Sequence, residues 1–198
     1  MESKNKILTR LRHNTQEKFD MPDLNMLHGI TYADPVAQFI LKATTTAGAR
    51  LIELDKEADL NRTVHNAYPE AHIFASNLAG IDVQMNPDTV SEARELTSVD
   101  VGIVEGSIGV AENACIWVPQ TMKEKAICFA SENLVILLRR CDIVSNMHQA
   151  YDMIAHDGKY FDPYKFGTFI SGPSKTADIE SALVYGAQAA RSLTIILR

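Results

Sequence analysis

The stretch GTFISGPSKTADIESALVYGAQAARSLTIILR occupies residues 167–198 and decides the fold class of this chain. It begins with an apolar strand end, after which Gly172 and Pro173 force a turn. Apolar residues then recur at helical spacing from Ile179 to Ala190, and the closing run SLTIILR is typical of a buried strand. We therefore expect a strand, a polar turn, a helix and a final strand.

The same alternation extends back to residue 34. Helices are predicted over 34–48, 56–67, 86–96 and 146–156, and strands over 49–54, 71–76, 125–131 and 133–140. Asp34, Pro35 and Gly48 supply the end signals of the first helix. Residues 99–118 contain three short strand-like pieces, and this part looks antiparallel. The pattern predicts an α/β protein with a mixed, largely parallel sheet flanked by helices.

The first 33 residues form a separate region in this interpretation. Ser3 to about Phe19 is a weakly amphipathic helix, with Ile7, Leu8 and Leu11 on one face. A polar stretch follows and reads as a linker or arm. We therefore divide the chain into an N-terminal helix and linker, residues 1–33, and an α/β domain, residues 34–198.

Charge and composition narrow the classes of partner. The chain has 198 residues and a net charge of −6, and no run of lysine and arginine stands out. This disfavours a nucleic acid or an anionic membrane as a partner. The N-terminus lacks the apolar segment of a signal peptide, and no apolar run approaches the ~20 residues that a membrane helix needs. We expect a cytoplasmic protein.

Metal and cofactor signals are weak in this sequence. The three cysteines, Cys115, Cys128 and Cys141, form no CxxC pair and read as small core residues in apolar strand-like runs. The six histidines show no metal-ligand spacing. We therefore predict no metal site and no cofactor in this chain.

The polar turn before the last predicted helix is a candidate anion-binding site. The first turn of a helix carries unpaired N–H groups and a partial positive charge, to which a lysine and several hydroxyls add here. Ordinary N-capping, with Asp178 and Glu180 complementing the dipole, is the alternative. The loop is not a Walker A loop, because Ser174 precedes the lysine. The predicted ligand-binding residues of this turn are Ser171, Gly172, Ser174, Lys175 and Thr176.

A second unusual stretch is GIVEGSIGVAENACIWV, residues 102–118. Its glycines permit tight turns or a close approach of backbone to ligand. A partly buried carboxylate between its two apolar pieces would suit a general base or nucleophile. A β-hairpin whose turn residues are merely polar is the alternative interpretation. The predicted catalytic residues are Glu112 and Glu105, and the predicted ligand-binding residues are Gly106, Ser107, Gly109 and Asn113.

These segments together resemble a known family. SGPSKTADIE (171–180), followed by the terminal strand LTIILR (193–198), resembles the signature of the LUD domain, found in the lactate-utilisation protein C group. VDVGIVEGSIGVAEN (99–113) resembles the second signature of that family, an Ala-Ile-Ala-Glu-Thr-Gly-like run. IVSNMHQAYDMI (143–154) resembles the helix between them. The resemblance spans roughly residues 34–198.

The resemblance implies a fold and a pathway. It implies a fold like that of ribose-phosphate isomerases and CoA transferases, and a role in oxidising lactate to pyruvate beside separate iron–sulfur subunits. Two segments depart from the family pattern. Glu-Thr-Gly becomes Glu112-Asn113-Ala114, and a Gly-Val-His-Gly-Pro-like run becomes residues 186–190, Gly-Ala-Gln-Ala-Ala.

Three functions stay open at this point. The first is a cluster-free component of a lactate utilisation system, which needs no catalytic residue of its own. The second is an enzyme or binding domain for a phosphorylated or CoA-linked small molecule, held by Ser171–Thr176 with Glu112 as base or nucleophile. The third is a relative that kept the fold and lost the activity, which the two departures motivate. The sequence does not decide whether the chain is an enzyme.

Overall fold

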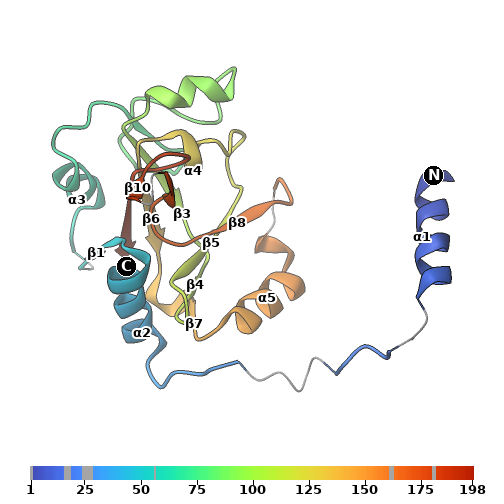
Figure 1. Cartoon of the computed structure of the whole chain (residues 1–198). Coiled ribbons are helices and arrows are strands. Elements are labelled where there is room, and N and C mark those ends of the chain that lie inside the picture. The colour runs from blue at the N-terminus through green and yellow to red at the C-terminus, as the bar shows by residue number, and fades with distance from the viewer. Residues whose placement is uncertain (1, 16–18, 24–28, 56, 161–162, 180–181) are drawn as a thin grey trace.

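The structure is a computed structural model that describes residues 2–15, 19–23, 29–55, 57–160, 163–179 and 182–198 (Figure 1). Its main element is a five-stranded sheet in the order β1-β11-β6-β3-β2, in which every pairing is parallel. The strands are β1 (Arg50–Glu53), β2 (Phe74–Ala75), β3 (Val101–Glu105), β6 (Asn133–Leu138) and β11 (Ser192–Leu197). The prediction of a mixed α/β fold with a largely parallel sheet is confirmed.

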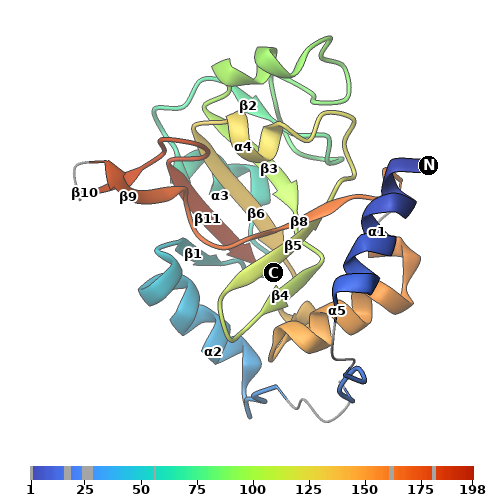
Figure 2. The same cartoon turned by 45° about the vertical axis from the view of Figure 1, so that its right-hand side comes forward.

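Two smaller sheets complete the described strands. One has the order β7-β4-β5-β8 and joins β4 to β5 and β5 to β8 in antiparallel pairs. The other is the antiparallel hairpin of β9 and β10, which projects from the body (Figure 2). Their bounds are β4 (Ile108–Val110), β5 (Cys115–Pro119), β7 (Ile143–Val144), β8 (Gly167–Ile170), β9 (Lys175–Ile179) and β10 (Ala182–Tyr185). The expected antiparallel insert is therefore β4 and β5, whereas β3 joins the parallel sheet.

Three predicted helices of the α/β part are present, and the first has the predicted cap at Asp34. Asp34 accepts a hydrogen bond from the Ala37 N–H (2.9 Å) at the start of α2, and Asn146 accepts one from the Gln149 N–H (3.0 Å) at the start of α5. Gly48, at φ +76°, ends the π-helical continuation of α2. The α-helices are α1 (Glu2–Asn14), α2 (Pro35–Lys42), α3 (Leu60–Ala67), α4 (Ile127–Ala130) and α5 (Met147–His156), and the π-helical segment is η2 (Ala43–Ala47).

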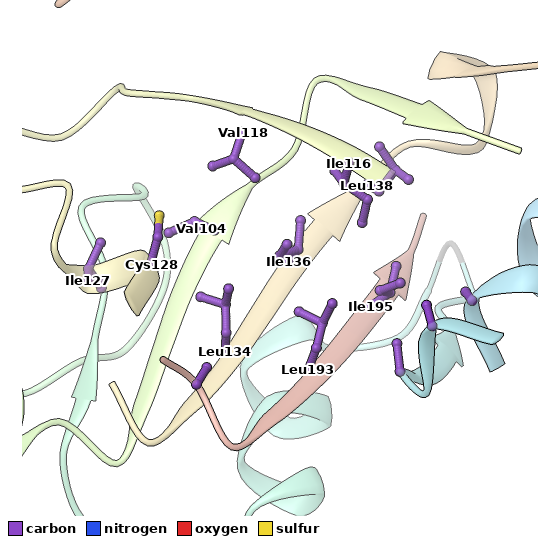
Figure 3. Close-up of a cluster of buried hydrophobic side chains, with 14 of the residues drawn as sticks. Val104, Ile116, Val118, Ile127, Cys128, Leu134, Ile136, Leu138, Leu193 and Ile195 are labelled. Atoms are coloured by element: carbon purple, nitrogen blue, oxygen red, sulfur yellow. The ribbon is translucent and has the colours of Figure 1, made fainter. Parts of the chain in front are cut away.

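The core lies on both faces of β6. Leu134, Ile136 and Leu138 point into one cluster, which also receives side chains of β3, β5, β11, α2 and α4 (Figure 3). Val135 and Leu137 point into the opposite cluster, which α3 covers from behind the sheet (Figure 2). All five side chains are buried. This explains why the strand reads as a continuous apolar run, since both of its faces are covered.

The helix predicted from Lys175 to Ala190 is wrong. The segment forms β9 and β10, and the N–H of Ser174 donates to the carbonyl of Ala190 (2.9 Å) at the base of the hairpin. Leu183 and Tyr185, at 58% and 46% exposed, bury no helical stripe. A Gly inside a helix is unfavourable by ~1 kcal/mol, and Gly186 here has φ +79°. The positive φ of Gly186 and the lack of a buried helical stripe therefore favour the hairpin over a helix.

Three further boundaries differ from the sequence expectation. Residues 86–96 form an Asn86 turn, where the Asp88 N–H donates to the Asn86 side chain (2.8 Å), and then the 3₁₀ helix η3 (Ala93–Ser98). The Asn86 side chain satisfies a backbone donor locally, which competes with a helix start. Residues 125–131 contain the helical turn α4 in place of a strand, and only Phe74–Ala75 of 71–76 pair as a strand.

The predicted N-terminal helix is present as α1. Figure 1 shows α1 standing apart from the α/β body, and residues 16–18 and 24–28 of the predicted helix end and linker lie outside the described residues. The division into residues 1–33 and 34–198 stays a prediction. Within the described ranges, no helix combines the length and apolarity needed to cross a bilayer.

Candidate functional site

The Ser171 turn lies directly after β8, at the edge of the smaller mixed sheet. The hydroxyl of Ser171 donates to the carbonyl oxygen of Asn113 at 2.9 Å. Gly172 has φ +69°, and a Cβ there would lie 2.1 Å from the carbonyl oxygen of Ala47. The turn therefore sits between the β4–β5 hairpin and η2, and it joins the two sequence segments predicted to form a site.

Glu112 and Asn113 form the tip of the β4–β5 hairpin. The carboxylate of Glu112 accepts a hydrogen bond from the N–H of Met147 (2.8 Å), the first residue of α5. Asn113 accepts one from the N–H of Cys115 (3.0 Å). Both side chains thus satisfy backbone donors, and a carboxylate at a helix N-terminus also complements the helix dipole. In this geometry the side chain of Glu112 stabilises the start of α5.

Cys115 lies beside this hairpin tip. Burial raises the pKa of its thiol, a hydrogen bond with Ser171 opposes that shift, and the charge of Glu112 adds to it. A raised pKa disfavours the thiolate, which is the nucleophilic form. The geometry therefore places Cys115, Glu112 and Ser171 close together without activating the thiol.

Lys175 does not lie in the first turn of a helix, because no helix follows the turn. Its ammonium donates to the carbonyl oxygens of Ala47 (2.6 Å) and Thr46 (3.4 Å) at the carboxyl end of η2. A cation at a helix C-terminus is favourable. The prediction that a helix dipole contributes to anion binding at this turn is therefore wrong. Lys175 instead uses N–H donors to bind the last carbonyls of η2.

A pocket of about 420 Å³ opens beside the same turn. It lies over the amino-terminal ends of β6 and β11, at Leu134 and Leu193. The turn therefore lies at the amino-terminal edge of the parallel sheet, opposite the carboxyl edge where open α/β sheets usually bind ligands. Besides those two leucines, the residues lining it include Cys128, Phe129, Phe169, Ser171, Gly172, Pro173, Ser174, Lys175 and Gln188. Glu112, Asn113 and Thr176 are not among the residues that line this pocket.

The other predicted residues lie in a different place. Glu105, Gly106 and Ser107 line a polar pocket of about 340 Å³ at the carboxyl end of β3, together with Arg139, Asp142 and Tyr160. Gly109 lies in β4, where a Cβ would meet Leu138 at 2.8 Å, so it serves close packing of the two sheets. The predicted site residues therefore divide between two pockets and the β4–β5 hairpin, and Thr176 lies apart from these in β9.

Sequence reasoning missed Arg139 and Asp142, the other charged residues of the pocket that Glu105 lines. Arg139 forms two hydrogen bonds to Asp142, at 2.6 and 3.0 Å, and this pairing raises the pKa of the guanidinium. Arg198 pairs with Glu105 across the strand ends. The available signal was positional, since Arg139 and Arg198 each follow a buried apolar strand, where ligands of open α/β sheets usually bind.

The sequence profile of the LUD domain matches residues 49–197. The chain belongs to the LUD-domain family. A crystal structure of a DUF162 family protein from Deinococcus radiodurans is similar to this chain, with a TM-score of 0.64 and 15% identity. The alignment covers 85% of this chain and 99% of that one, and at this identity it shows the fold alone. No curated protein matches the chain.

The two departures from the LUD pattern have definite places in the fold. Ala114 ends the hairpin loop with φ +55°, a left-handed conformation that a glycine adopts without strain. Gln188, which belongs to the second of these departures, lines the pocket beside the Ser171 turn. The first departure therefore strains a turn, whereas the second changes the chemistry of a pocket wall. No group of acidic, histidine and cysteine side chains suited to a metal occurs among the residues whose positions are given.

Proposed function

We propose that this LUD-domain protein is the cluster-free component of a system that oxidises lactate to pyruvate. The family match over residues 49–197 carries the proposal. Lactate loses two electrons and two protons in this reaction, and the electrons need an acceptor. The three cysteines lie on β5, α4 and beyond β6 and form no CxxC motif, so we assign the acceptor to iron–sulfur partner subunits. A cytoplasmic location goes with this proposal.

Deletion of the gene in its native host tests the proposal. We expect growth on lactate as the carbon source to be lost, growth on pyruvate to be kept, and the wild-type chain to restore the loss. A tagged chain should co-purify with proteins that carry CxxCxxC motifs. Unchanged growth on lactate, together with no iron–sulfur protein on the tagged chain, would refute it.

A second proposal is that the pocket at the Ser171 turn holds a small anionic ligand. The observation behind it is the Ser171–Asn113 hydrogen bond, which joins two signature segments beside this pocket. Lysine has three N–H donors, and two of those of Lys175 face η2, which leaves one for a ligand. Ser174 and Gln188 line the same pocket with a hydroxyl and an amide. A phosphorylated or CoA-linked compound fits these donors.

In this second proposal, Glu112 can act on a ligand only if its side chain moves. Its carboxylate is bound to the N–H of Met147, and a catalytic contact needs a separation near ~3 Å from the reacting atom. If Glu112 is the base or nucleophile, that hydrogen bond opens when ligand binds. Glu112→Gln would then abolish turnover while leaving binding in place.

Thermal shift and calorimetry against phosphate, phosphosugars, CoA esters, lactate and pyruvate test the pocket. We expect one compound to raise the melting temperature, and Ser174→Ala to weaken its binding. Ser91→Ala removes an exposed serine that does not line this pocket, and it serves as the matched control. If no compound binds, the pocket proposal fails while the lactate proposal stands, and a chain that fails both tests is a relative that lost the activity.

A further inference from the structure

The carboxyl edge of the parallel sheet carries an alternation of opposite charges. Glu53, Arg198 and Glu105 end or follow β1, β11 and β3, and Arg139 and Arg140 follow β6. Arg140 pairs with Glu53, Arg198 with Glu105, and Arg139 with Asp142. Three arginines and three carboxylates therefore balance at the edge where open α/β sheets bind their ligands.

Two pockets adjoin at this edge, and Glu105 lines both. The polar one, of about 340 Å³, is the pocket of Glu105, Ser107 and Arg139 described above. The other pocket, which Arg198 also borders, has a volume of about 280 Å³. Aliphatic residues make up most of its lining, and polar atoms also contribute to its surface; the aliphatic residues are Leu60, Leu78, Ala79, Ile81 and Leu137, with Glu105 and Arg198 at its border. The polar pocket thus meets this pocket of aliphatic side chains, which we call the apolar lobe, at one ion pair.

The ion pair of Arg198 and Glu105 uses only some of the hydrogen-bonding atoms of these two side chains. Only Nη2 of Arg198 and Oε1 of Glu105 are joined by a hydrogen bond, and among the described residues no further hydrogen bond is made by the guanidinium or by Oε2, although the charge of Arg139 also acts on Glu105. A guanidinium has five donors, and a carboxylate has two acceptor oxygens. Both side chains are accessible, at 37% and 42% exposed. The pair therefore presents a free donor and a free acceptor of opposite charge, side by side.

The backbone holds this pair in position. The N–H of Arg198 donates to Leu138 and its carbonyl accepts from the N–H of Arg140, both at 3.0 Å. The N–H of Gly106 donates to Leu137 (2.8 Å), and a Cβ on Gly106 would meet Ile116 at 2.3 Å. Both strand ends are thus fixed by the ladder and by close packing, so the backbone positions from which the two charged side chains extend are preorganised.

We propose that this edge binds a free aliphatic α-amino acid. The carboxylate of the ligand pairs with the open N–H groups of Arg198, its ammonium pairs with Oε2 of Glu105, and its side chain enters the apolar lobe. A simple anion fits less well, because it would meet the negative charge of Glu105. A zwitterion presents the opposite charge to each partner, in keeping with the charge balance of the edge. This site is independent of the pocket at the Ser171 turn, which lies at the other end of β6 and β11.

Calorimetry and backbone amide NMR on the full chain test the site with four matched probes. L-leucine carries both charges and an aliphatic side chain, isocaproate lacks the ammonium, isoamylamine lacks the carboxylate, and glycine lacks the side chain. We expect leucine to bind and to shift the amides of 105–107 and 78–81. Each of the other probes should bind about tenfold or more weakly, because each loses a charge-assisted hydrogen bond or the apolar contact.

Two variants locate the binding, and a second ion pair provides their control. Arg198→Met and Glu105→Gln should each weaken leucine binding about tenfold or more. Arg191 and Glu132 form a comparable exposed pair before β11 and β6, at the opposite end of the same strands. Arg191→Met and Glu132→Gln should therefore leave binding unchanged.

The probe series on the wild-type chain decides the proposal even if a variant does not fold. No binding of leucine, or binding of isocaproate as tight as that of leucine, overturns it. Equal loss in the Arg191→Met control also overturns it, since the effect would then not belong to this edge.

Discussion

Lys175 donates its ammonium to the main-chain carbonyl of Ala47 at 2.6 Å, across 128 positions of the sequence. Thr46 accepts a second, longer contact. The last carbonyls of a helix have no partner within it, and a cation there is favourable. The lysine that the sequence marks as an anion binder is thus also a cap, and it ties the β9–β10 hairpin to the helix before β1.

Lys175→Met should lower the free energy of unfolding by about 1 kcal/mol, because the two carbonyls lose a charged donor. Urea denaturation at low ionic strength measures the loss, and added salt should reduce it. Lys4→Met, which removes an exposed lysine of α1, is the control and should change stability little. A Lys175→Met chain as stable as the wild type would show that the cap contributes nothing.

Gly172→Ala should be more damaging than the same change at Gly80. Both residues have positive φ, +69° and +78°, so both alanines carry left-handed strain of ~1–2 kcal/mol. Only at Gly172 does the new Cβ also collide with a backbone atom, 2.1 Å from the oxygen of Ala47, whereas nothing lies within 4 Å at Gly80. Chemical denaturation of both variants measures the difference. Equal destabilisation would mean that the turn moves away from η2 at no cost.

Local sequence signals predict those parts of the fold whose causes are local. The buried run of β6, the cap at Asp34 and the apolar stripe of 146–156 predict their elements, because side chains and backbone groups within a few residues decide them. Local signals do not predict the β9–β10 hairpin. Ile179, Ala182 and Leu183 fit a helical stripe equally well, and the pairing of Ser174 with Ala190 spans the whole segment.

The candidate site divides in the same way. The family resemblance links Ser171 to the Glu112 segment, and in the structure Ser171 donates a hydrogen bond to Asn113. The pair of Arg198 and Glu105 could not be predicted, because it exists only once the strand order is known. Residues 93 positions apart meet because β11 and β3 both border β6.

The three thiols should react with alkylating reagents in a fixed order. Cys141 is exposed, Cys115 is half-buried, and Cys128 is buried. Burial raises the pKa of Cys128 to about 12 and also raises that of Cys115. Because the thiolate is the reactive form, mass spectrometry should find Cys141 modified first and Cys128 only after unfolding. Early modification of Cys128 in the native chain would contradict its burial on the inner side of α4.

Asp100 supplies a pH-dependent contribution to stability. Its Oδ2 accepts hydrogen bonds from the backbone N–H groups of His72 (2.7 Å) and Ile73 (2.8 Å), just before β2. These bonds, from Ile73 first and then His72, lower the pKa of the carboxyl against a smaller opposing effect of burial, and the charge of His72 lowers it further. The carboxylate therefore fastens the short edge strand to β3.

The sign of the effect follows from that shift. A carboxyl with a depressed folded pKa stabilises the protein above its unfolded value of ~3.9, and the contribution disappears as the pH falls through the folded pKa. Asp100→Ala should therefore cost about 1–3 kcal/mol at neutral pH, from two lost charge-assisted bonds, and less in acid. Urea denaturation of both chains across this range measures it, with Asp82→Ala at an exposed position as control. A destabilisation that is independent of pH would show that Asp100 acts through packing and not through its charge.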